Sequence, residues 1–396
     1  MAGSTVIVLN SLKGVQDLLE KRSAIYSDRP DYVMLNDLSG LSYHFAFMRY
    51  NERWKEHKKV FKQEFQPPAN VHYKPNIAMA VRRMLSELLE SPENFDHHFR
   101  HMNGMFVLST CYGLDVQPSN DSYVSIGEKT LKALAQAGNG TEYLVEHVPI
   151  TRVLGVMDVD GERDPHQIKV LQNVLGAMYA ASTDTTVSAL ESFILGMLKN
   201  PESQRKAQQK ITEVIGDVRL PDFSDIGSIP YVDAIMKETL RWKPVTPLAM
   251  PHRVIEDDEY KGFHIPAGAV VVGNSWAILH DESLYGPDTH LFDPERFLNA
   301  GGTLNSDVPH PTMAFGFGRR QCPGIDQAES LLWLTIASIL CCFNISKHVD
   351  ENGVVDEPTC KFTSGMLCYP LPFKCSIRPR SPLAESLIEG ANDMYL

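Results

Sequence analysis

The chain has 396 residues, of which 43% are hydrophobic, and it carries a formal charge of −12 at pH 7. A chain of this length and apolar content can bury a large core, and no shift in composition divides it into parts. The negative charge excludes nucleic acid as an expected partner, because that binding depends on cation–phosphate contacts. The seven cysteines show no framework spacing and no signal peptide is recognisable before them, which indicates a reducing compartment.

Apolar periodicity predicts a short strand at Thr5–Leu9 and then an amphipathic helix over Leu12–Arg22. Residues 254–274 predict short strands, and Phe362–Leu371 with Phe373–Arg378 predicts a closing hairpin. Further helices are expected at Asn51–Phe65, Met79–Leu89, Phe95–Tyr112, Tyr123–Ala137, Gly176–Lys199, Tyr231–Trp242 and Ile325–Phe343. The helix over residues 176–199 is apolar nearly all round, so we expect it to be central.

A glycine-rich loop at residues 315–324, FGFGRRQCPG, presents Cys322 just before the apolar helix that starts at residue 325. A dinucleotide fingerprint would need glycine where the chain has Gln321. A phosphate-binding cysteine loop would need a basic residue where the chain has Ala328. Zinc would need a second ligand at short spacing, and none lies nearby. The remaining choice is between an inert buried cysteine and a reactive thiolate.

The neighbours of Cys322 favour the thiolate. Gly316 and Gly318 allow the backbone to pass close to a flat ligand, and Arg320 offers a fixed cation for an acidic group. The helix that follows Pro323 directs its first N–H groups back toward the sulfur. We therefore interpret Cys322 as a thiolate ligand of haem iron.

Two other patterns have both a structural and a functional interpretation. Asp184 and Thr185 lie inside the central apolar helix, where they indicate either a bent core helix with satisfied hydroxyls or a site that admits water or a diatomic ligand. Glu238 and Arg241 share a helix face at i, i+3, a spacing that is usually a surface salt bridge worth under about 1 kcal/mol.

A lysine stripe at Lys55, Lys59 and Lys62 is either a solvated face or a docking patch for an acidic partner. Trp54 and Lys58 lie one turn apart on another face of the same helix.

Together these features resemble the cytochrome P450 family, over almost the whole chain from Val6 to about Ser381. The loop matches that family's F-x-x-G-x-R-x-C-x-G signature at every fixed position, as Phe315, Gly318, Arg320, Cys322 and Gly324. The resemblance implies a mainly α fold with small β-sheets: an α-rich domain plus a smaller β domain.

The resemblance also implies roles for individual residues. Cys322 would bind the iron of haem b, and Asp184 with Thr185 would relay protons to bound oxygen. The other haem contacts would come from Trp54, Lys58, His252, Arg253, Phe315, Gly316, Gly318, Arg320 and Gly324. Glu238, Arg241 and Arg296 would form a buried lock. The substrate wall would include Phe45, Phe47, Ala177, Leu248, Ala249, Met366 and Leu367.

The implied activity is a monooxygenase that inserts one oxygen atom of O2 into a small hydrophobic substrate, in fungal secondary metabolism or xenobiotic oxidation. Electrons would come from NADPH through cytochrome P450 reductase, with cytochrome b5 as a further donor. The alternative of the same fold is a haem-binding protein with little or no turnover, and a third hypothesis is a helical interaction protein with a structural cysteine loop.

We expect a single domain over residues 1–396. Relative to the family, it would be shortened at the N-terminus, without its membrane anchor, and again at residues 149–175, where the roof helices of the substrate pocket usually lie. Membrane association at the cytoplasmic face of the endoplasmic reticulum is expected of the family, and a soluble cytoplasmic protein is expected if the chain is complete as given.

Overall fold

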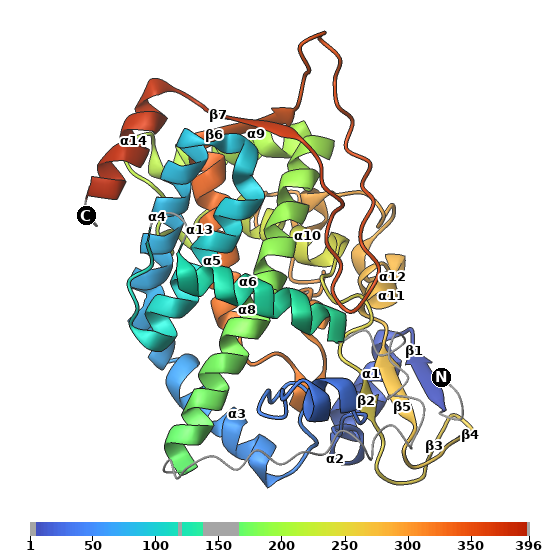
Figure 1. Ribbon diagram of the computed structural model, residues 1–396. Helices are drawn as coiled ribbons and strands as arrows, with labels where there is room; N and C mark the ends of the chain where they lie inside the picture. The colour runs from blue at the N-terminus through green and yellow to red at the C-terminus, as the bar shows by residue number, and fades with distance from the viewer. Residues whose placement is uncertain (1–4, 118–120, 138–165, 394–396) are drawn as a thin grey trace.

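The computed structural model describes residues 5–117, 121–137 and 166–393. Long helices form most of the molecule; two small sheets lie on the side that holds the N-terminus, and a third, β6 (Phe343–Lys347) with β7 (Cys375–Pro379), lies at the other end near α9 and α14 (Figure 1). The long helices are α3 (Glu52–Phe65), α4 (Lys74–Glu90), α5 (Phe95–Tyr112), α6 (Ser122–Ala137), α8 (His166–Lys199), α9 (Pro201–Ile215), α10 (Pro230–Trp242), α13 (Ile325–Cys342) and α14 (Pro382–Asp393). This architecture confirms the predicted mainly α fold with small sheets.

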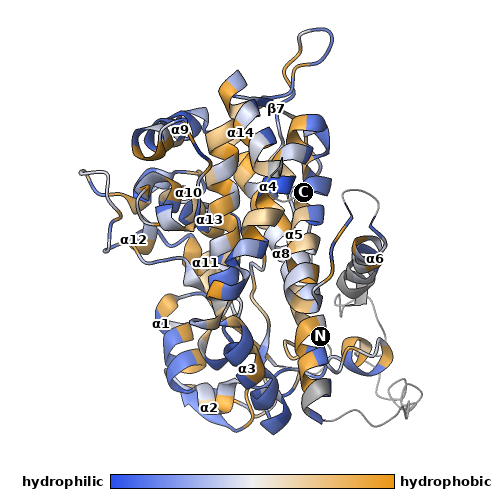
Figure 2. Cartoon of the chain, turned by 90° about the vertical axis from the view of Figure 1, so that its left-hand side faces the viewer, coloured by the Kyte–Doolittle hydropathy of each residue, from blue (hydrophilic) through white to orange (hydrophobic). Residues whose placement is uncertain are grey.

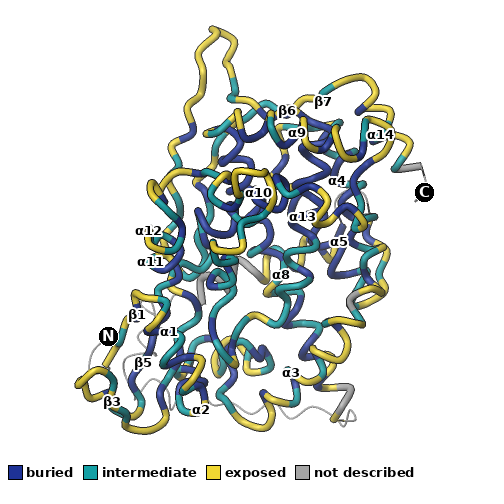
Figure 3. The backbone as a smooth tube through the Cα atoms, turned by 180° about the vertical axis from the view of Figure 1, so that it is seen from behind, coloured by how far each residue is buried: buried dark blue, intermediate teal, exposed yellow. Residues whose placement is uncertain are grey.

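Short helical segments connect these elements. They are α1 (Leu12–Val15), η1 (Gln16–Lys21), α2 (Ser23–Tyr26), η2 (Val33–Leu38), η3 (Ala69–Tyr73), η4 (Pro92–Asn94), η6 (Phe223–Asp225), α11 (Ser275–Leu279), α12 (Glu282–Tyr285), η7 (Pro294–Phe297), η8 (Thr312–Phe315) and η9 (Gly318–Arg320). Figure 3 shows that exposed backbone is concentrated in the connecting loops, whereas buried backbone runs through the central helices.

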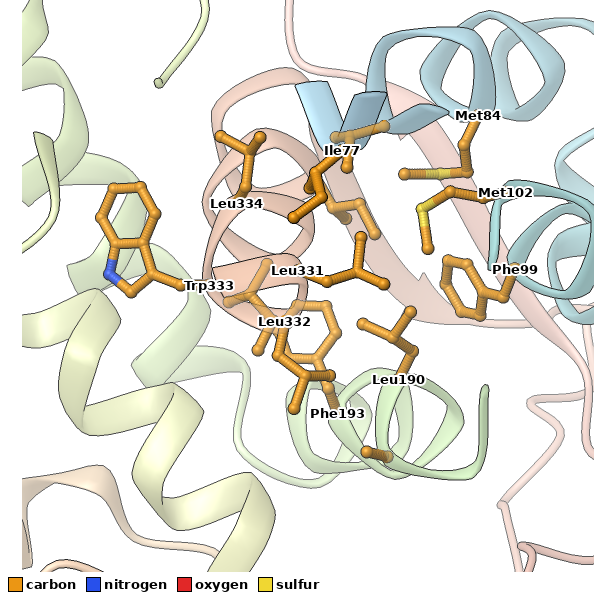
Figure 4. Packing of buried hydrophobic residues seen from close by; sticks show 14 of the residues in the cluster. Ile77, Met84, Phe99, Met102, Leu190, Phe193, Leu331, Leu332, Trp333 and Leu334 are labelled. Carbon is orange, nitrogen blue, oxygen red and sulfur yellow. The ribbon is translucent and has the colours of Figure 1, made fainter. Parts of the chain in front are cut away.

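Helix α13 lies in the core and packs against α4, α8, α9 and α10. Its side chains Leu331 and Leu332 point toward Leu190 and Phe193 of α8, while Trp333 projects from another face (Figure 4). Among the helices of the described residues, α13 alone has the length and apolarity of a membrane span, and 72% of it is buried inside the fold. Figure 2 shows this apolar helix surrounded by the others, as expected for a core helix.

Helix α8 starts ten residues earlier than the sequence pattern predicted. The prediction began at Gly176, whereas the helix begins at His166, because Val170 and Val174 continue its apolar face into the core. Residues 166–175 therefore belong to α8 and not to a separate connection. The rest of the segment predicted to be shortened, residues 149–165, lies outside the described residues.

The sheet at the N-terminal side joins distant parts of the chain. Strand β1 (Val6–Leu9) pairs in parallel with β5 (Val270–Gly273), and β2 (His252–Arg253) pairs antiparallel with β5. Strands β3 (Asp258–Tyr260) and β4 (Phe263–Ile265) form a separate hairpin. The predicted short strands in this region are confirmed. The pairing holds α1 and η1 in place, and η1 packs against η9 of the cysteine loop.

The predicted closing hairpin is wrong. Strand β7 (Cys375–Pro379) pairs antiparallel with β6 (Phe343–Lys347), which follows α13, and not with residues 362–371. The register places Ile345 opposite Ile377, and both side chains are buried. Burial of these two isoleucines selects the long-range partner, while residues 362–371 form only an isolated bridge between Phe362 and Pro370.

Candidate active site

The cysteine loop is a tight turn that requires its glycines. Gly316 and Gly318 have φ values of 80° and 57°, in the left-handed region that favours glycine. A Cβ atom at Gly318 would also overlap the carbonyl oxygen of Leu19 in η1. The Cys322 N–H donates to the Phe315 carbonyl at 2.8 Å and closes the loop. The loop therefore packs against η1, and α13 begins directly after the loop.

The thiol of Cys322 faces a cavity. Its exposed surface belongs to the cavity wall, because protein encloses the sulfur on its other sides. Burial raises the pKa of the Cys322 thiol, whereas the Gly324 N–H and the Lys58 ammonium group act in the opposite direction and favour the thiolate. The net effect is a raised pKa, and a cation beside the sulfur would favour the thiolate.

This cavity of about 280 Å³ is lined by the cysteine loop and by the middle of α8. Of the residues proposed from the sequence, those in its wall are Phe45, Trp54, Lys58, Ala177, Thr185, Ala249, His252, Phe315, Gly316, Arg320, Cys322 and Gly324. Those outside its wall are Phe47, Asp184, Glu238, Arg241, Leu248, Arg253, Arg296, Gly318, Met366 and Leu367.

One end of the cavity holds buried cations. The Arg320 guanidinium is 8% exposed, donates to the carbonyls of Ser27, Phe45 and Met48 at 2.7, 3.3 and 2.5 Å, and lies 4.3 Å from the centre of the Trp54 ring. Arg29 is 3% exposed and donates to the backbone carbonyls of Ala46, Met250 and Pro251.

Lys58 is the third cation at this end. Its ammonium donates to the Arg319 carbonyl at 2.5 Å and lies 5.1 Å from the centre of the Trp54 ring. Burial, reinforced by the charges of Lys62 and Arg320, lowers the pKa of Lys58 to about 8. His252 lies nearby with its Nδ1 2.7 Å from the Tyr26 carbonyl, and burial lowers its pKa to about 3. This ring is therefore neutral.

These cations provide a test of whether the cavity fits haem. No carboxylate in the described part of the chain forms an ion pair with Arg29, Lys58 or Arg320. Burial lowers the pKa of Arg29 and of Arg320, and the charge of Asp28, which is paired with Arg49, opposes that fall only in part, so both positive charges are held at a cost. A ligand with acidic groups at one end and a cation that binds thiolate satisfies both ends of the cavity. Haem, with two propionates and an iron, has this form.

On the α8 side, hydroxyl groups bond back to the helix. Thr183 donates to the Tyr179 carbonyl at 2.9 Å and Thr185 to the Ala181 carbonyl at 2.8 Å. The helix continues without a break through this segment. Thr185 lines the cavity, whereas Asp184 turns to α5, where its carboxylate accepts from Arg100 at 2.9 Å.

Comparison with known proteins agrees with the cavity and its cysteine loop. The family model "Cytochrome P450" matches residues 1–137 and 147–375. The chain belongs to the cytochrome P450 family. It is 36% identical to cytochrome P450 monooxygenase ple1 of Rhodocybe pseudopiperita over 437 aligned positions, with 98% of this chain and 83% of the relative covered. The alignment is longer than this chain, so the relative contains internal residues that this P450 lacks.

Two further relatives are cytochrome P450 monooxygenase claR of Ampulloclitocybe clavipes, 35% identical with 100% of this chain and 82% of the relative covered, and tryptamine 4-monooxygenase of Psilocybe cyanescens, 32% identical with 98% and 85% covered. This P450 is an oxygen-inserting monooxygenase of the fungal type. Cytochromes P450 hold a haem whose iron takes a cysteine thiolate, receive electrons from a redox partner and oxidise small substrates. They are usually associated with membranes.

Behind the cysteine loop of this P450, Glu238 is fully buried and bound by two arginines. Its carboxylate accepts from Arg241 Nε at 2.6 Å and Nη2 at 2.8 Å, and from Arg296 Nε at 3.2 Å. The backbone N–H of Asp293 donates to the same carboxylate at 2.8 Å. Sequence spacing alone indicated a surface bridge, but side chains of Glu238 and Arg241 are both 0% exposed. The cluster ties α10 to the segment that leads toward the cysteine loop.

The residues proposed for the substrate wall separate into two groups. Phe45, Ala177 and Ala249 line the cavity. Phe47 instead packs with Leu35 in a small cluster that Met366 covers, and Leu248 is 53% exposed. Leu367 is not part of the wall either.

Sequence reasoning missed Arg29 and His44, which both line the cavity. It named Arg253 in their place, but Arg253 lies outside the wall with its guanidinium 3.6 Å from Asp31. Arg29 is a single arginine in a loop and belongs to no motif quoted above. Only the fold, which brings residue 29 beside residues 250 and 251, identifies it.

Proposed function

We propose that this P450 is a haem-thiolate monooxygenase in which Cys322 is the iron ligand and the whole chain acts as one domain. When bound, haem b supplies the redox chemistry that activates O2 and transfers one of its oxygen atoms to the substrate. The Gly324 N–H and Lys58 would stabilise the Cys322 thiolate, and the glycines of the loop would keep the backbone clear of the flat ring.

The observation that carries this proposal is the pairing of Cys322 with the buried cations in one cavity. Arg29, Lys58 and Arg320 would receive the two propionates, and His252 would stand beside them. Trp54 fixes two of these cations against its ring faces, at 4.3 Å for Arg320 and 5.1 Å for Lys58. An anion that arrives here removes the cost of burying the charges, so binding is selective for an acidic ligand.

Thr185 and Asp184 would control protons on the α8 side. Because the Thr185 hydroxyl donates to the Ala181 carbonyl, its oxygen lone pairs are available to accept a proton donor in the cavity. Asp184 precedes Thr185 in the same helical turn and would pass protons to it from the side of α8 that faces α5.

The substrate would be a small hydrophobic molecule. Phe45, Phe106, Ala177, Met178 and Ala249 give the cavity an apolar wall that suits such a molecule. The named relatives include tryptamine 4-monooxygenase, which supports a role in fungal secondary metabolism for this chain as well.

Electrons would come from NADPH through a flavin reductase that docks on the cysteine side. The Lys55 ammonium and the Arg319 guanidinium lie 5.6 and 5.7 Å from the centre of the Tyr50 ring, so two cations lie on this face. Lys59 lies on the same helix as Lys55. An acidic reductase surface fits this patch, and the family's usual location suggests the cytoplasmic face of the endoplasmic reticulum.

Titration of the apoprotein with haem and with haem dimethyl ester tests the cavity assignment. We expect haem to bind at least ten-fold more tightly than the ester, which lacks the two acidic groups, and Arg29→Met to reduce that ratio. Arg205→Met is the matched control, because Arg205 is 67% exposed on α9. Equal affinity for haem and ester, or the same loss in both variants, would contradict the assignment.

A further inference from the structure

Outside the cavity, charged side chains of α5 and α8 form a compact cluster. It consists of Arg100 on α5, Asp184 and Glu191 on α8, and Tyr369 from the chain before β7. The Arg100 guanidinium lies 2.9 Å from Asp184 and 4.0 Å from Glu191, and 5.9 Å from the centre of the Tyr369 ring. Asp184 and Glu191 are seven residues apart, so they occupy the same face of α8. We call these four residues the Arg100 cluster.

The cluster has one positive charge for two buried carboxyl groups. Asp184 and Glu191 are both 8% exposed. Asp184 accepts the hydrogen bond from Arg100, whereas the part of the chain that the structure describes offers Glu191 no hydrogen bond. A buried carboxylate without a close partner takes up a proton instead of remaining charged. The geometry therefore gives the charge to Asp184 and the proton to Glu191.

The charges that face Glu191 agree with this assignment. Burial raises the pKa of Glu191 to about 7, Arg100 opposes that rise, and the carboxylates of Asp96 and Asp184 add to it. Tyr369 faces the same carboxyl groups, and burial with the Asp184 charge raises its pKa, so it stays neutral. Glu191 is then a neutral acid near pH 7 that can both release and recover a proton.

A second contact between the two helices sets the register of the cluster. Asn103 follows Arg100 by three residues on α5 and is fully buried. Its amide donates to the Ser182 carbonyl at 2.8 Å, and its oxygen accepts from the Ser182 hydroxyl at 3.3 Å. Helices α5 and α8 lie side by side (Figure 1). The contacts at Ser182 and Asp184 hold this segment of α8 against α5.

We propose that Glu191 is the proton reservoir for Asp184. The proton leaves the Glu191 carboxyl and forms an O–H bond on the Asp184 carboxylate, while Arg100 stays charged and now pairs with the Glu191 carboxylate. When Asp184 has passed the proton on toward Thr185, water reloads Glu191 along the exposed side of Arg100, whose side chain is 28% accessible. The inference rests on the proposed function, which assigns proton delivery to Asp184 and Thr185.

The first test measures the protonation state and needs no turnover. Infrared difference spectra between pH 5 and pH 8 should show protonated carboxyl bands that disappear near neutrality, from Glu191 and from Glu329, because burial raises the pKa of each to about 7. Glu191→Gln should remove the part of this signal that comes from Glu191. Folding stability should fall as pH rises from about 4.5 to about 7, because the folded state binds the extra proton in that window. Glu191→Gln should reduce that fall, to which Glu329 and His101 also contribute, and Glu202→Gln, an exposed glutamate on α9, should leave it unchanged. An unchanged band in Glu191→Gln would overturn the reservoir.

The second test measures coupling in the haem-loaded enzyme with reductase, NADPH and ethoxycoumarin as the probe. We expect Glu191→Gln to release several-fold more peroxide per NADPH than the native enzyme, with a flatter pH profile, as Thr185→Ala does. If Thr185→Ala uncouples and Glu191→Gln does not, the reservoir is refuted while the proposed function stands. If neither variant uncouples, the role of Asp184 and Thr185 in the proposed function fails and the reservoir fails with it.

Discussion

The buried carboxylate of Glu238 allows a direct test of what holds the cysteine side of this P450 together. Its oxygens accept from Arg241 at 2.6 and 2.8 Å and from Arg296 at 3.2 Å. Glu238→Gln keeps the shape and one acceptor oxygen but removes the negative charge that pairs with both guanidinium groups. Both arginines then keep their charge in the interior, where Arg241 is 0% and Arg296 5% exposed.

The size of the effect follows from that burial. Removal of one partner from a buried ion pair costs about 3–5 kcal/mol, because it leaves an uncompensated charge. Here one substitution leaves two such charges, so we expect the free energy of unfolding to fall by at least about 3 kcal/mol. An exposed pair with the same i, i+3 spacing contributes about 0.2–1 kcal/mol. Burial, and not spacing, therefore sets the difference.

Urea unfolding followed by tryptophan fluorescence measures both cases. The matched control is Glu202→Gln, since Glu202 and Arg205 have the same i, i+3 spacing but are 53% and 67% exposed. We expect Glu238→Gln to lower the midpoint strongly and to weaken haem retention, and Glu202→Gln to leave both within error. Equal shifts in the two variants would refute the reasoning from burial.

Three further predictions concern the loop, the α4–α5 contact and α8. Gly318→Ala should lower stability by more than Gly353→Ala in thermal unfolding, because both glycines have positive φ but only Gly318 has a backbone carbonyl where the Cβ would lie; equal losses would contradict this. Burial opposes protonation of His101, but its 2.7 Å contact with Glu87 prevails and raises its pKa. The stability that the protonated ring adds is therefore complete below about pH 6.5 and is lost as pH rises through the pKa of His101 in the folded protein. His101→Gln should flatten that loss in pH-dependent unfolding, and an unchanged slope would contradict the role of this contact. Thr185→Val should leave haem binding unchanged and raise peroxide release several-fold. If Thr185→Val releases no more peroxide per NADPH than the native enzyme, the hydroxyl has no role in proton control.

Local patterns in the sequence were sufficient for the helices and the cysteine loop. Helix faces repeat every few residues, and the glycines, arginine and cysteine of the loop act on one another within ten positions. The start of α8 was placed too late because residues 166–175 follow a polar stretch, although Val170 and Val174 continue the buried face. Extension of the periodicity backward from Gly176 would have found them.

Long-range contacts could not be predicted in the same way. The partner of β7 is β6, some thirty residues away, and the choice depends on a core formed by several helices. Arg29 reaches the cavity only because the fold brings its loop beside Met250 and Pro251. Likewise, the Glu238 pair could be assigned to the interior only through the family resemblance, because i, i+3 spacing carries no information on burial.

The measurement that decides whether Cys322 binds iron is the carbon monoxide difference spectrum of the reduced, haem-loaded protein. We expect the red-shifted Soret band of a thiolate-bound haem in the native protein and in the control Cys375→Ala, a cysteine of β7 that is not part of the cavity wall. Cys322→Ala should lose that band. A thiolate-type band that persists in Cys322→Ala, or a native protein that takes up no haem, would contradict the assignment.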